Sequence, residues 1–223
     1  MTAWIWIVGI LAVLLTALFI RVNQYGAPQV KLLLKALASL GFVALGLLGA
    51  ARTGGAYAWL VWIGLILGAV GDVALQLMDC RPQKKDSCFR TGLGAFLVGH
   101  VFYIVAFALL QRWTFWPILG AAVLFAVLFA LQFPARIELG AQKGPVYAYG
   151  AVISLMAAFA VGAAGAAGAR GVLVLFGGAL FLVSDAILAL IFFSPLRKKS
   201  LPTWNLATYY AAQILLAISI AVG

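Results

Sequence analysis

The segment GLILGAVGDVALQLM (residues 64–78) places Asp72 in the middle of an apolar run that reads as part of a membrane-spanning helix. The segment FGGALFLVSDAILALIFF (residues 176–193) repeats this arrangement around Asp185. On insertion scales, an aspartate at the centre of such a helix costs about 2.5–3.5 kcal/mol, so each one marks a candidate functional site. We therefore interpret the rest of the chain as a scaffold that brings these two carboxyl groups together.

The composition of the chain is that of a polytopic membrane protein. Of its 223 residues, 66% are hydrophobic and only 9% are charged. In a typical soluble domain, charged residues make up about 25% of the chain. The first apolar run has no basic segment before it and is long enough to span a bilayer. We therefore expect no cleavable signal, and a single transmembrane domain over residues 1–223.

Eight apolar runs predict an all-α bundle of eight transmembrane helices, because each run is close to the roughly 20 residues that a spanning helix needs. The predicted helices cover residues 3–20, 30–50, 57–79, 92–111, 115–133, 145–166, 170–193 and 203–222. Four prolines, Pro28, Pro117, Pro145 and Pro202, lie near predicted helix starts, where the missing backbone N–H of proline costs little.

The net charge of +10 comes mostly from short loops at one end of the predicted bundle. The basic residues in or beside the loops after the odd-numbered helices are Arg21, Lys31, Lys35, Arg81, Lys84, Lys85, Arg90, Arg136, Lys143, Arg197, Lys198 and Lys199. The even-numbered loops carry only Arg52, Arg112 and Arg170. This bias predicts that the odd-numbered loops are cytoplasmic and that both termini face the other side. Because topology explains the charge, we expect no nucleic-acid partner.

Two cysteines, Cys80 and Cys88, flank one of the loops that we predict to be cytoplasmic. The cytoplasm is reducing, so we favour two free thiols over a disulfide. With these two cysteines and a single histidine, the chain is a poor candidate for a zinc site built from His and Cys ligands.

Polar residues in the predicted helices gather at one depth. At about 1.5 Å per residue, they lie within about 15 Å of the predicted cytoplasmic interface. They are Lys35, Asp72, His100, Tyr149, Ser154, Asp185, Tyr209, Tyr210 and Gln213. The other half of the bundle has almost no comparable group. This distribution indicates one polar layer that opens to the cytoplasmic side.

The spacing of these residues indicates that the layer faces protein rather than lipid. Asn205, Tyr209 and Gln213 follow one another at intervals of four residues, which places them on one face of the last helix. Gly68 lies one turn before Asp72, and small residues at this spacing allow helices to approach closely. We therefore expect both aspartates to point into the bundle.

Each of these residues also has a purely structural interpretation. A lone intramembrane aspartate can be a hydrogen-bonded core residue, and His100 is as readily a satisfied core histidine as a catalytic one. Lys31 and Lys35 can extend to the interface without binding a ligand. Asn205 can cap a helix, and Ser154 can bond to the backbone of its own helix. The sequence has no GxSxG, HExxH, P-loop or dinucleotide-binding motif to support a serine hydrolase, a zinc protease or a nucleotide enzyme.

Five segments, taken in order, carry a family resemblance: GDVALQLM, GLGAFLVGHVFYIVAF, YGAVISLM, LFLVSDAILAL and ATYYAAQILLAIS. Together they resemble the YhhN-type lysoplasmalogenases, which include the vertebrate alkenylglycerophospholipid hydrolases. The resemblance implies an eight-helix membrane hydrolase that cleaves the vinyl ether bond of a lysoplasmalogen, a lysophospholipid. The products would be a fatty aldehyde and glycerophosphoethanolamine or glycerophosphocholine. The polar positions that match the family's motifs are Asp72, Asp185, His100, Tyr149, Tyr209, Tyr210 and Lys35.

From this resemblance we expect two-aspartate acid/base chemistry like that of the glycosidases, in which one carboxyl is protonated and the other is ionised. Asp185 is assigned as the acid and Asp72 as the base or cation stabiliser. The water-orienting groups would be His100, Tyr149, Asn205, Tyr209, Tyr210 and Gln213. Lys35, with Lys31, would hold the lipid phosphate. The alkenyl chain would lie in the apolar outer half of the bundle, and no metal or organic cofactor is required.

Two rival functions use the same residues. Intramembrane Asp, His and Tyr also form the proton relays of coupled transporters, although a carrier should be open to both faces. A lipid-binding membrane protein without turnover is the other alternative. The richness in Gly and Ala favours a bacterial cytoplasmic membrane, while an endoplasmic reticulum location is compatible with the family resemblance.

Overall fold

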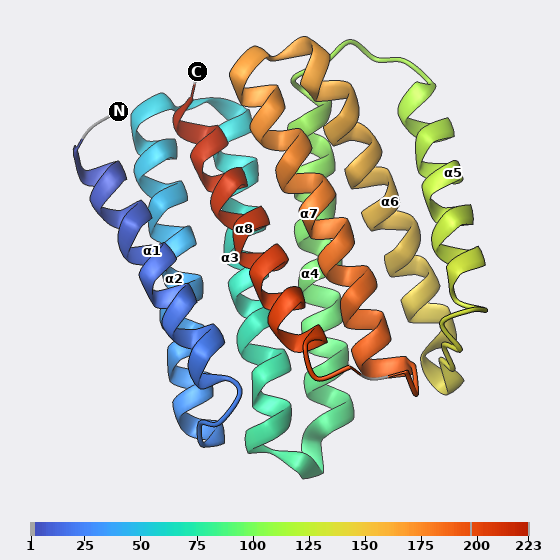
Figure 1. The fold of residues 1–223 in the computed structure, drawn as a ribbon. Helices are drawn as coiled ribbons and strands as arrows, with labels where there is room; N and C mark the ends of the chain where they lie inside the picture. The colour runs from blue at the N-terminus through green and yellow to red at the C-terminus, as the bar shows by residue number, and fades with distance from the viewer. Residues whose placement is uncertain (1–2, 197, 223) are drawn as a thin grey trace.

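The computed structural model describes residues 3–196 and 198–222, and within these residues the chain forms eight α-helices and two short 3-10 helices (Figure 1). The α-helices are α1 (Ala3–Val22), α2 (Pro28–Thr53), α3 (Gly55–Cys80), α4 (Lys85–Ala108), α5 (Trp116–Leu131), α6 (Lys143–Ala166), α7 (Gly168–Phe193) and α8 (Leu201–Ala221). The 3-10 helices, Pro82–Lys84 and Gly140–Gln142, lie just before α4 and α6. The predicted all-α fold with eight helices is therefore confirmed. Arg197, one of the loop residues used in the sequence analysis, lies outside the described residues.

The fourth helix shows the largest difference from the predicted bounds. The sequence analysis expected residues 92–111, whereas α4 runs from Lys85 to Ala108 and so includes Cys88. The fifth helix, predicted over residues 115–133, agrees to within two residues, since α5 has 16 residues and ends at Leu131. The turn after α5 continues through Gln132 and Phe133 to Arg136, which has a positive φ of 51°. The other seven α-helices are each long and apolar enough to cross a membrane.

Tight turns and prolines set the helix ends. Pro28, Pro117 and Pro202 lie in the first two positions of α2, α5 and α8, where a helix has no use for a backbone N–H. A single residue, Gly54, separates α2 from α3, and its φ of 64° is a conformation that glycine adopts without strain. The turn between α6 and α7 likewise uses Gly168, with a φ of 53°. Both hairpins are therefore sharp.

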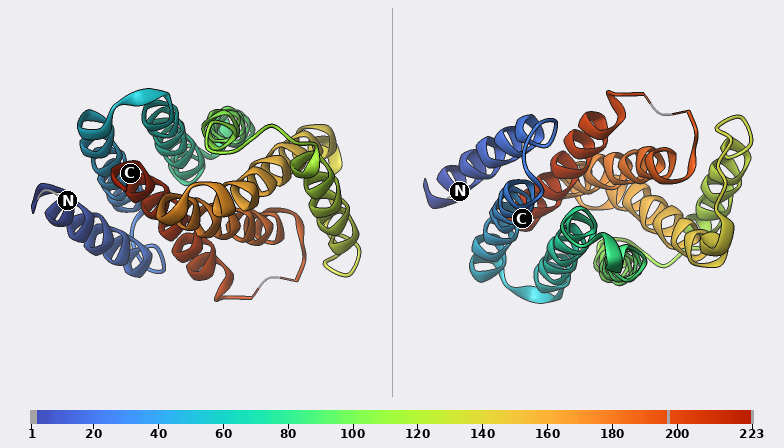
Figure 2. Two further views of the ribbon diagram at one scale, coloured as in Figure 1. Left: turned by 90° about the horizontal axis from the view of Figure 1, so that it is seen from above. Right: turned by 90° about the horizontal axis from the view of Figure 1, so that it is seen from below.

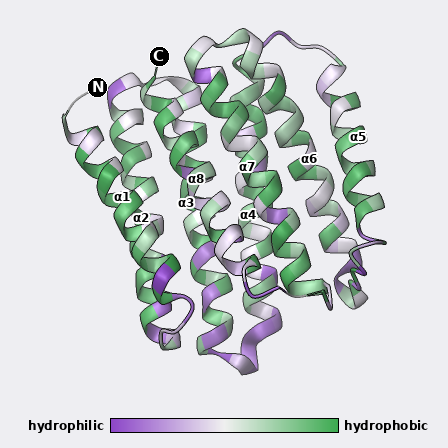
Figure 3. Cartoon of the chain, viewed as in Figure 1, coloured by the Kyte–Doolittle hydropathy of each residue, from purple (hydrophilic) through white to green (hydrophobic). Residues whose placement is uncertain are grey.

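The helices pack around α8, which contacts α1, α2, α3 and α7. The views along the bundle place α1 and α5 at opposite edges (Figure 2). The large interfaces of α5 are confined to α6, so most of its surface faces outward. Hydrophobic residues cover the middle of the bundle, and hydrophilic residues gather at the end that carries the α1–α2 and α3–α4 turns (Figure 3). This distribution fits a multi-pass membrane protein.

Glycines on α3 allow the close helix contacts that the sequence predicted. A Cβ atom added at Gly64 would overlap the ring of Tyr103 on α4, and one at Gly68 would overlap the amide of Gln213 on α8. The same face carries Asp72, which is only 2% exposed. The expectation that this aspartate faces protein is therefore confirmed.

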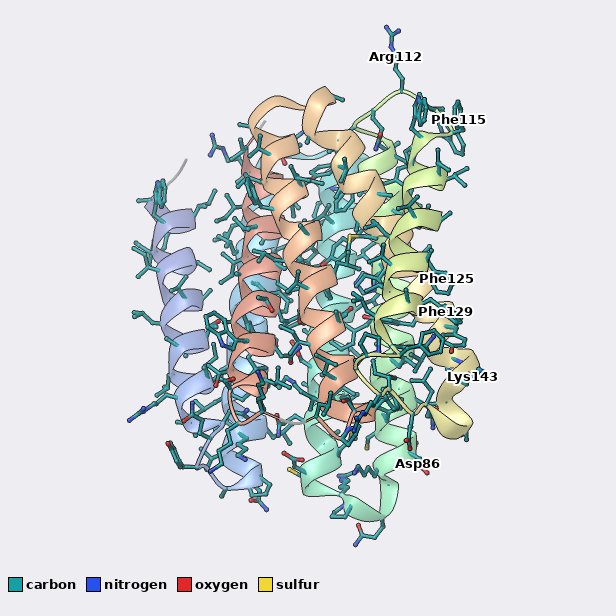
Figure 4. The ribbon with its side chains drawn as sticks, turned by 45° about the vertical axis from the view of Figure 1, so that its right-hand side comes forward. Asp86, Arg112, Phe115, Phe125, Phe129 and Lys143 are labelled. Carbon is teal, nitrogen blue, oxygen red and sulfur yellow. The ribbon has the colours of Figure 1, made fainter. Side chains whose placement is uncertain are left out.

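The predicted orientation can be tested with single cysteines, because Cys80 and Cys88 are both free and can be removed as Cys80→Ser and Cys88→Ser. In that background we expect Asp86→Cys to react with a membrane-impermeant maleimide only from the cytoplasmic side. Arg112→Cys should react only from the opposite side, because the two residues are exposed at opposite ends of the bundle (Figure 4). The cysteine-free background measures nonspecific labelling. The reverse pattern would show that the odd-numbered loops are not cytoplasmic.

Candidate functional site

Asp72 on α3 is surrounded by three donors in the interior of the bundle. Its Oδ2 atom accepts hydrogen bonds from the hydroxyls of Ser39 and Tyr209, both at 2.7 Å. Its Oδ1 atom lies 3.4 Å from the ammonium nitrogen of Lys35. Lys35 is itself only 7% exposed, so both charges of this pair are removed from water. A pair of this kind is stable only while both partners and the additional hydrogen bonds are present.

The donors around Asp72 come from two helices whose local spacing aligns them. Lys35 and Ser39 are four residues apart on α2, so their side chains lie on one face. The hydroxyl of Tyr210 lies 3.3 Å from that of Ser39 and donates to the carbonyl oxygen of Lys35 at 3.4 Å. Tyr210 therefore holds the α2 side of the site to α8.

A second layer of hydrogen bonds positions Tyr209. The amide nitrogen of Gln213, one turn along α8, donates to the Tyr209 hydroxyl at 3.0 Å. The amide oxygen of Gln213 in turn accepts a hydrogen bond from the hydroxyl of Tyr103 on α4 at 2.8 Å. The network around Asp72 thus joins α2, α3, α4 and α8. We call the set of Lys35, Ser39, Asp72, Tyr209 and Tyr210 the Asp72 cluster.

Asp185 has a different environment. The hydroxyl of Tyr149 on α6 donates to its Oδ2 atom at 2.5 Å. The same two residues line a cavity of about 340 Å³ between α5, α6 and α7, which we call the inner cavity. They also line a smaller cavity of about 50 Å³ that is bordered by α3, α4, α6 and α7. Asp185 therefore lies where two cavities meet.

The inner cavity is apolar apart from a few groups. Its walls include Phe125 and Phe129 of α5, Ile153 of α6 and Leu182 of α7. Its polar side chains, in addition to Tyr149 and Asp185, are Gln132 and Tyr147, and the Tyr147 hydroxyl donates to the Gln132 amide oxygen at 2.9 Å. A cavity of this size with a few convergent polar groups is typical of a small-molecule site.

The position of the inner cavity differs from the expected place of the lipid chain. It lies between the C-terminal halves of α5 and α7 and the first half of α6, on the half of the bundle that we predict to be cytoplasmic. The sequence analysis expected apolar space for the alkenyl chain in the outer half, above the polar layer. A second apolar cavity, lined by residues of α5 and α6, lies in that half.

Asp72 and Asp185 have different surroundings. Among the described residues, they have separate hydrogen-bond partners, and a row of ring contacts connects the two. The ring of Tyr209 lies 5.4 Å from that of Phe181, and Phe181 lies 4.6 Å from His100. His100 lies 5.4 Å from Tyr149, the partner of Asp185. The two carboxyl groups are thus linked through aromatic side chains, and their joint action in catalysis stays a prediction.

His100 lies in this row of rings and is 1% exposed. Its Nε2 atom has no hydrogen-bond partner among the described residues. A buried polar atom of this kind calls for an explanation, because leaving it unpaired is costly. Its ring packs edge-on against Tyr149 on the Asp185 side and against Phe181 and Tyr103 on the side of the Asp72 cluster.

Other predicted site residues have structural partners. Asn205 donates to the backbone oxygen of Ser184 at 2.8 Å and to its hydroxyl at 3.0 Å, so it ties α8 to α7 and neither caps a helix nor reaches an aspartate. Ser154 donates to the carbonyl of Gly150 in its own helix at 2.7 Å. Lys31 is half-buried in the first turns of α2.

Three residues of the sites were not found from the sequence. Ser39 could have been identified, because it lies one turn after Lys35 on the same helix face. Tyr103 lies three residues after His100 and is likewise on a shared face. Phe181 lies one turn before Asp185, so its spacing places it on the face of α7 that leads to Asp185. The spacing does not reveal that its ring packs between two polar sites.

Comparison with known proteins gives the family. The model of the YhhN family matches residues 30–220. This chain belongs to the YhhN family. The YhhN match runs from the start of α2 to the end of α8, so it contains both aspartates and all of their hydrogen-bond partners. Phe19 of α1, outside the matched range, also contacts the Asp72 cluster: its ring lies 6.0 Å from the Lys35 ammonium and 6.0 Å from the ring of Tyr210.

Two curated relatives of this YhhN protein are mammalian. The mouse protein "Lysoplasmalogenase TMEM86B" is 33% identical over 178 residues, which is 77% of this chain and 68% of the mouse protein. The rat protein of the same name is 31% identical over 183 residues, which is 77% of this chain and 66% of the rat protein. No solved structure matches the chain.

The buried Lys35–Asp72 pair leads to a prediction about the free energy of unfolding. Lys35→Met should lower the free energy of unfolding by roughly 3–5 kcal/mol, because it leaves a buried carboxylate without its cation. Lys35→Met/Asp72→Asn should recover a clear part of this loss, which unfolding in detergent would measure as a double-mutant cycle. Lys31→Met, one turn earlier, is the matched control and should have little effect. Simple additivity of the two single changes would contradict the proposed coupling.

Proposed function

We propose that this chain is a lysoplasmalogenase that hydrolyses the vinyl ether bond of a lysophospholipid within the membrane. The observation that carries the proposal is Asp185, a carboxyl group that lines an apolar cavity large enough for part of a lipid chain. The names of the mouse and rat relatives support the same activity. On the predicted topology, the reaction takes place in the half of the membrane nearer the cytoplasm.

The chemistry requires an acid next to an apolar ligand. A vinyl ether is hydrolysed when a proton adds to its β-carbon, which converts the α-carbon and the ether oxygen into an oxocarbenium ion. Water then adds to the α-carbon, and the resulting hemiacetal breaks down into a fatty aldehyde and the free hydroxyl of the glycerophospholipid. We assign the first proton to the Oδ1 atom of Asp185, since Oδ2 already accepts the hydrogen bond from Tyr149.

The same residue can serve both halves of the reaction. After giving up its proton, Asp185 is a carboxylate beside the cation, and it can accept a proton from the incoming water. The small cavity of about 50 Å³ is on the α3 and α4 side of Asp185 and is large enough for that water, which needs about 10–15 Å³. The Asp185 carboxyl and the Tyr149 hydroxyl would be its polar partners.

We propose a supporting role for Asp72. Three donors already surround its two oxygens, and it lines neither the inner cavity nor the small cavity beside Asp185. Its cluster instead fixes Tyr209, whose ring packs against Phe181 and, through it, against His100. We therefore propose that this network positions the rings of Phe181 and His100, which lead to Tyr149. The residues assigned to it are Asp72, Lys35, Tyr209, Tyr210 and Gln213.

The phosphate of the substrate needs a cation near the mouth of the inner cavity. Lys35 is bound to Asp72, and no residue of α2 lines this cavity. Lys143, the first residue of α6, is exposed, and its ammonium lies 5.9 Å from the ring of the cavity residue Tyr147. Figure 4 shows Lys143 at the same end of the bundle as the cytoplasmic turns. We therefore propose Lys143 for the phosphate in place of Lys31 and Lys35.

The first test is aldehyde release from lysoplasmenylethanolamine by purified protein in detergent. Asp185→Asn should lower kcat by roughly 10²–10⁴, the usual contribution of a general acid, without a large change in unfolding temperature. Asp72→Asn should lower unfolding temperature and reduce kcat by about tenfold or less. The saturated alkyl analogue, which has no vinyl ether, controls for binding without reaction.

Two results would change this scheme. Near-wild-type turnover by both variants would refute catalysis by either aspartate. Equal loss of turnover in Asp72→Asn and Asp185→Asn, with unchanged unfolding temperatures, would restore a mechanism in which both carboxyl groups take part directly.

Lys143→Ala gives a separate prediction for substrate binding. Loss of the cation should raise KM by about tenfold with little change in kcat, because the phosphate contact is the same in the ground state and the transition state. Lys31→Ala is the matched control and should leave both constants unchanged. If KM instead rises in Lys31→Ala and not in Lys143→Ala, the phosphate lies near the start of α2.

A further inference from the structure

A second cavity, of about 900 Å³, lies on the opposite half of the bundle, and we call it the outer cavity. It is bordered by α5, α6 and the segment that follows α4. Its apolar lining includes Val123 and Leu124 of α5 and Ala158 and Val161 of α6. Its polar residues, Gln111, Arg112 and Thr114, are at its far end.

The inner and outer cavities follow the same seam between α5 and α6. On α5, Leu124 lines the outer cavity and the next residue, Phe125, lines the inner one. On α6, Ile153 lines the inner cavity and Ala158 the outer one, which at about 1.5 Å per residue is a separation of about 7.5 Å. Phe125 is therefore at the junction, where Figure 4 shows it on the α5 side of the bundle.

The two helices approach closely at this junction. A Cβ atom added at Gly150 would lie 3.4 Å from the ring of Phe125, which is van der Waals contact, so the ring lies against α6. At Gly120 an added Cβ would lie 3.5 Å from Ala158 across the outer part of the same seam. The seam is thus narrow and apolar along both cavities.

A long lipid chain is longer than the inner cavity. A chain that crosses one leaflet spans about half of the roughly 30 Å hydrocarbon core, or about 15 Å. That distance corresponds to about ten residues of helix. Counted along α6 from Tyr149, which marks the level of Asp185, it ends beside Ala158 and Val161 in the outer cavity. A long chain bound with its first carbons at Asp185 must therefore extend past Phe125.

We propose that the alkenyl chain of the substrate runs from Asp185 along the α5–α6 seam into the outer cavity, and that the outer cavity makes the enzyme selective for long chains. This inference rests on the proposed function and adds a specificity site to it. The polar far end, at Gln111 and Arg112, limits the length of chain that fits. Because α5 is peripheral, the seam is also accessible from the surrounding lipid (Figure 2).

The test fills the outer cavity without touching the Asp185 site. Val123 is 56% exposed and Val161 is 60% exposed, so Val123→Trp and Val161→Trp should be tolerated by the fold. Val127, one turn after Val123 on α5, is 48% exposed and lines neither cavity, which makes Val127→Trp the matched control. Each variant is assayed with two lysoplasmenylethanolamines, one with an alkenyl chain of about 18 carbons and one of about eight.

We expect Val123→Trp and Val161→Trp to lower kcat/KM for the long substrate by about tenfold or more, and to leave the short substrate within about twofold of wild type. Val127→Trp should leave both within about twofold. Equal effects on the two chain lengths, or no effect on either, would overturn the inference and mean that bulk lipid fills the outer cavity. Absence of wild-type turnover with both substrates would instead refute the proposed function, and the inference with it.

Discussion

The requirement that buried charges find partners inside the protein governs the centre of this bundle. Lipid chains cannot hydrogen-bond a carboxylate, so the buried Asp72 depends on donors from neighbouring helices. Lys35 and Ser39 supply them from α2, and Tyr209 supplies one from α8. These contacts fix α2, α3 and α8 relative to one another. Helices α1, α4 and α7 pack directly on that unit, and α6 and α5 follow outward from α4 and α7.

Asp72 and Asp185 find their partners in different ways. Asp72 has donors at both oxygens and lines none of the three cavities described above. Asp185 has a hydrogen bond from Tyr149 and lies between two cavities. The proposed acid is therefore the carboxyl group that has space for a ligand beside it. Similar depth in the membrane does not imply similar surroundings.

Several features could be predicted from the sequence because they depend on local pattern. The apolar runs gave eight helices, and the four-residue spacing of Tyr209 and Gln213 placed them together on the buried face of α8. The pairing of Lys35 with Asp72 could not be predicted, because it depends on how α2 and α3 are rotated about their axes. The separation of Asp185 from Asp72 likewise depends on the lateral order of the helices, which hydropathy does not encode.

The single-residue turn at Gly54 joins two helices of equal length, α2 and α3, of 26 residues each. With so short a connection, the two helices cannot slide or turn independently. One residue inserted between Lys35 and Gly54 would rotate the Lys35 side chain by about 100° relative to α3. The hairpin is therefore sensitive to changes in its length but tolerates changes in its apolar residues. Insertions and deletions here would disturb the packing far more than in the longer turn between α5 and α6.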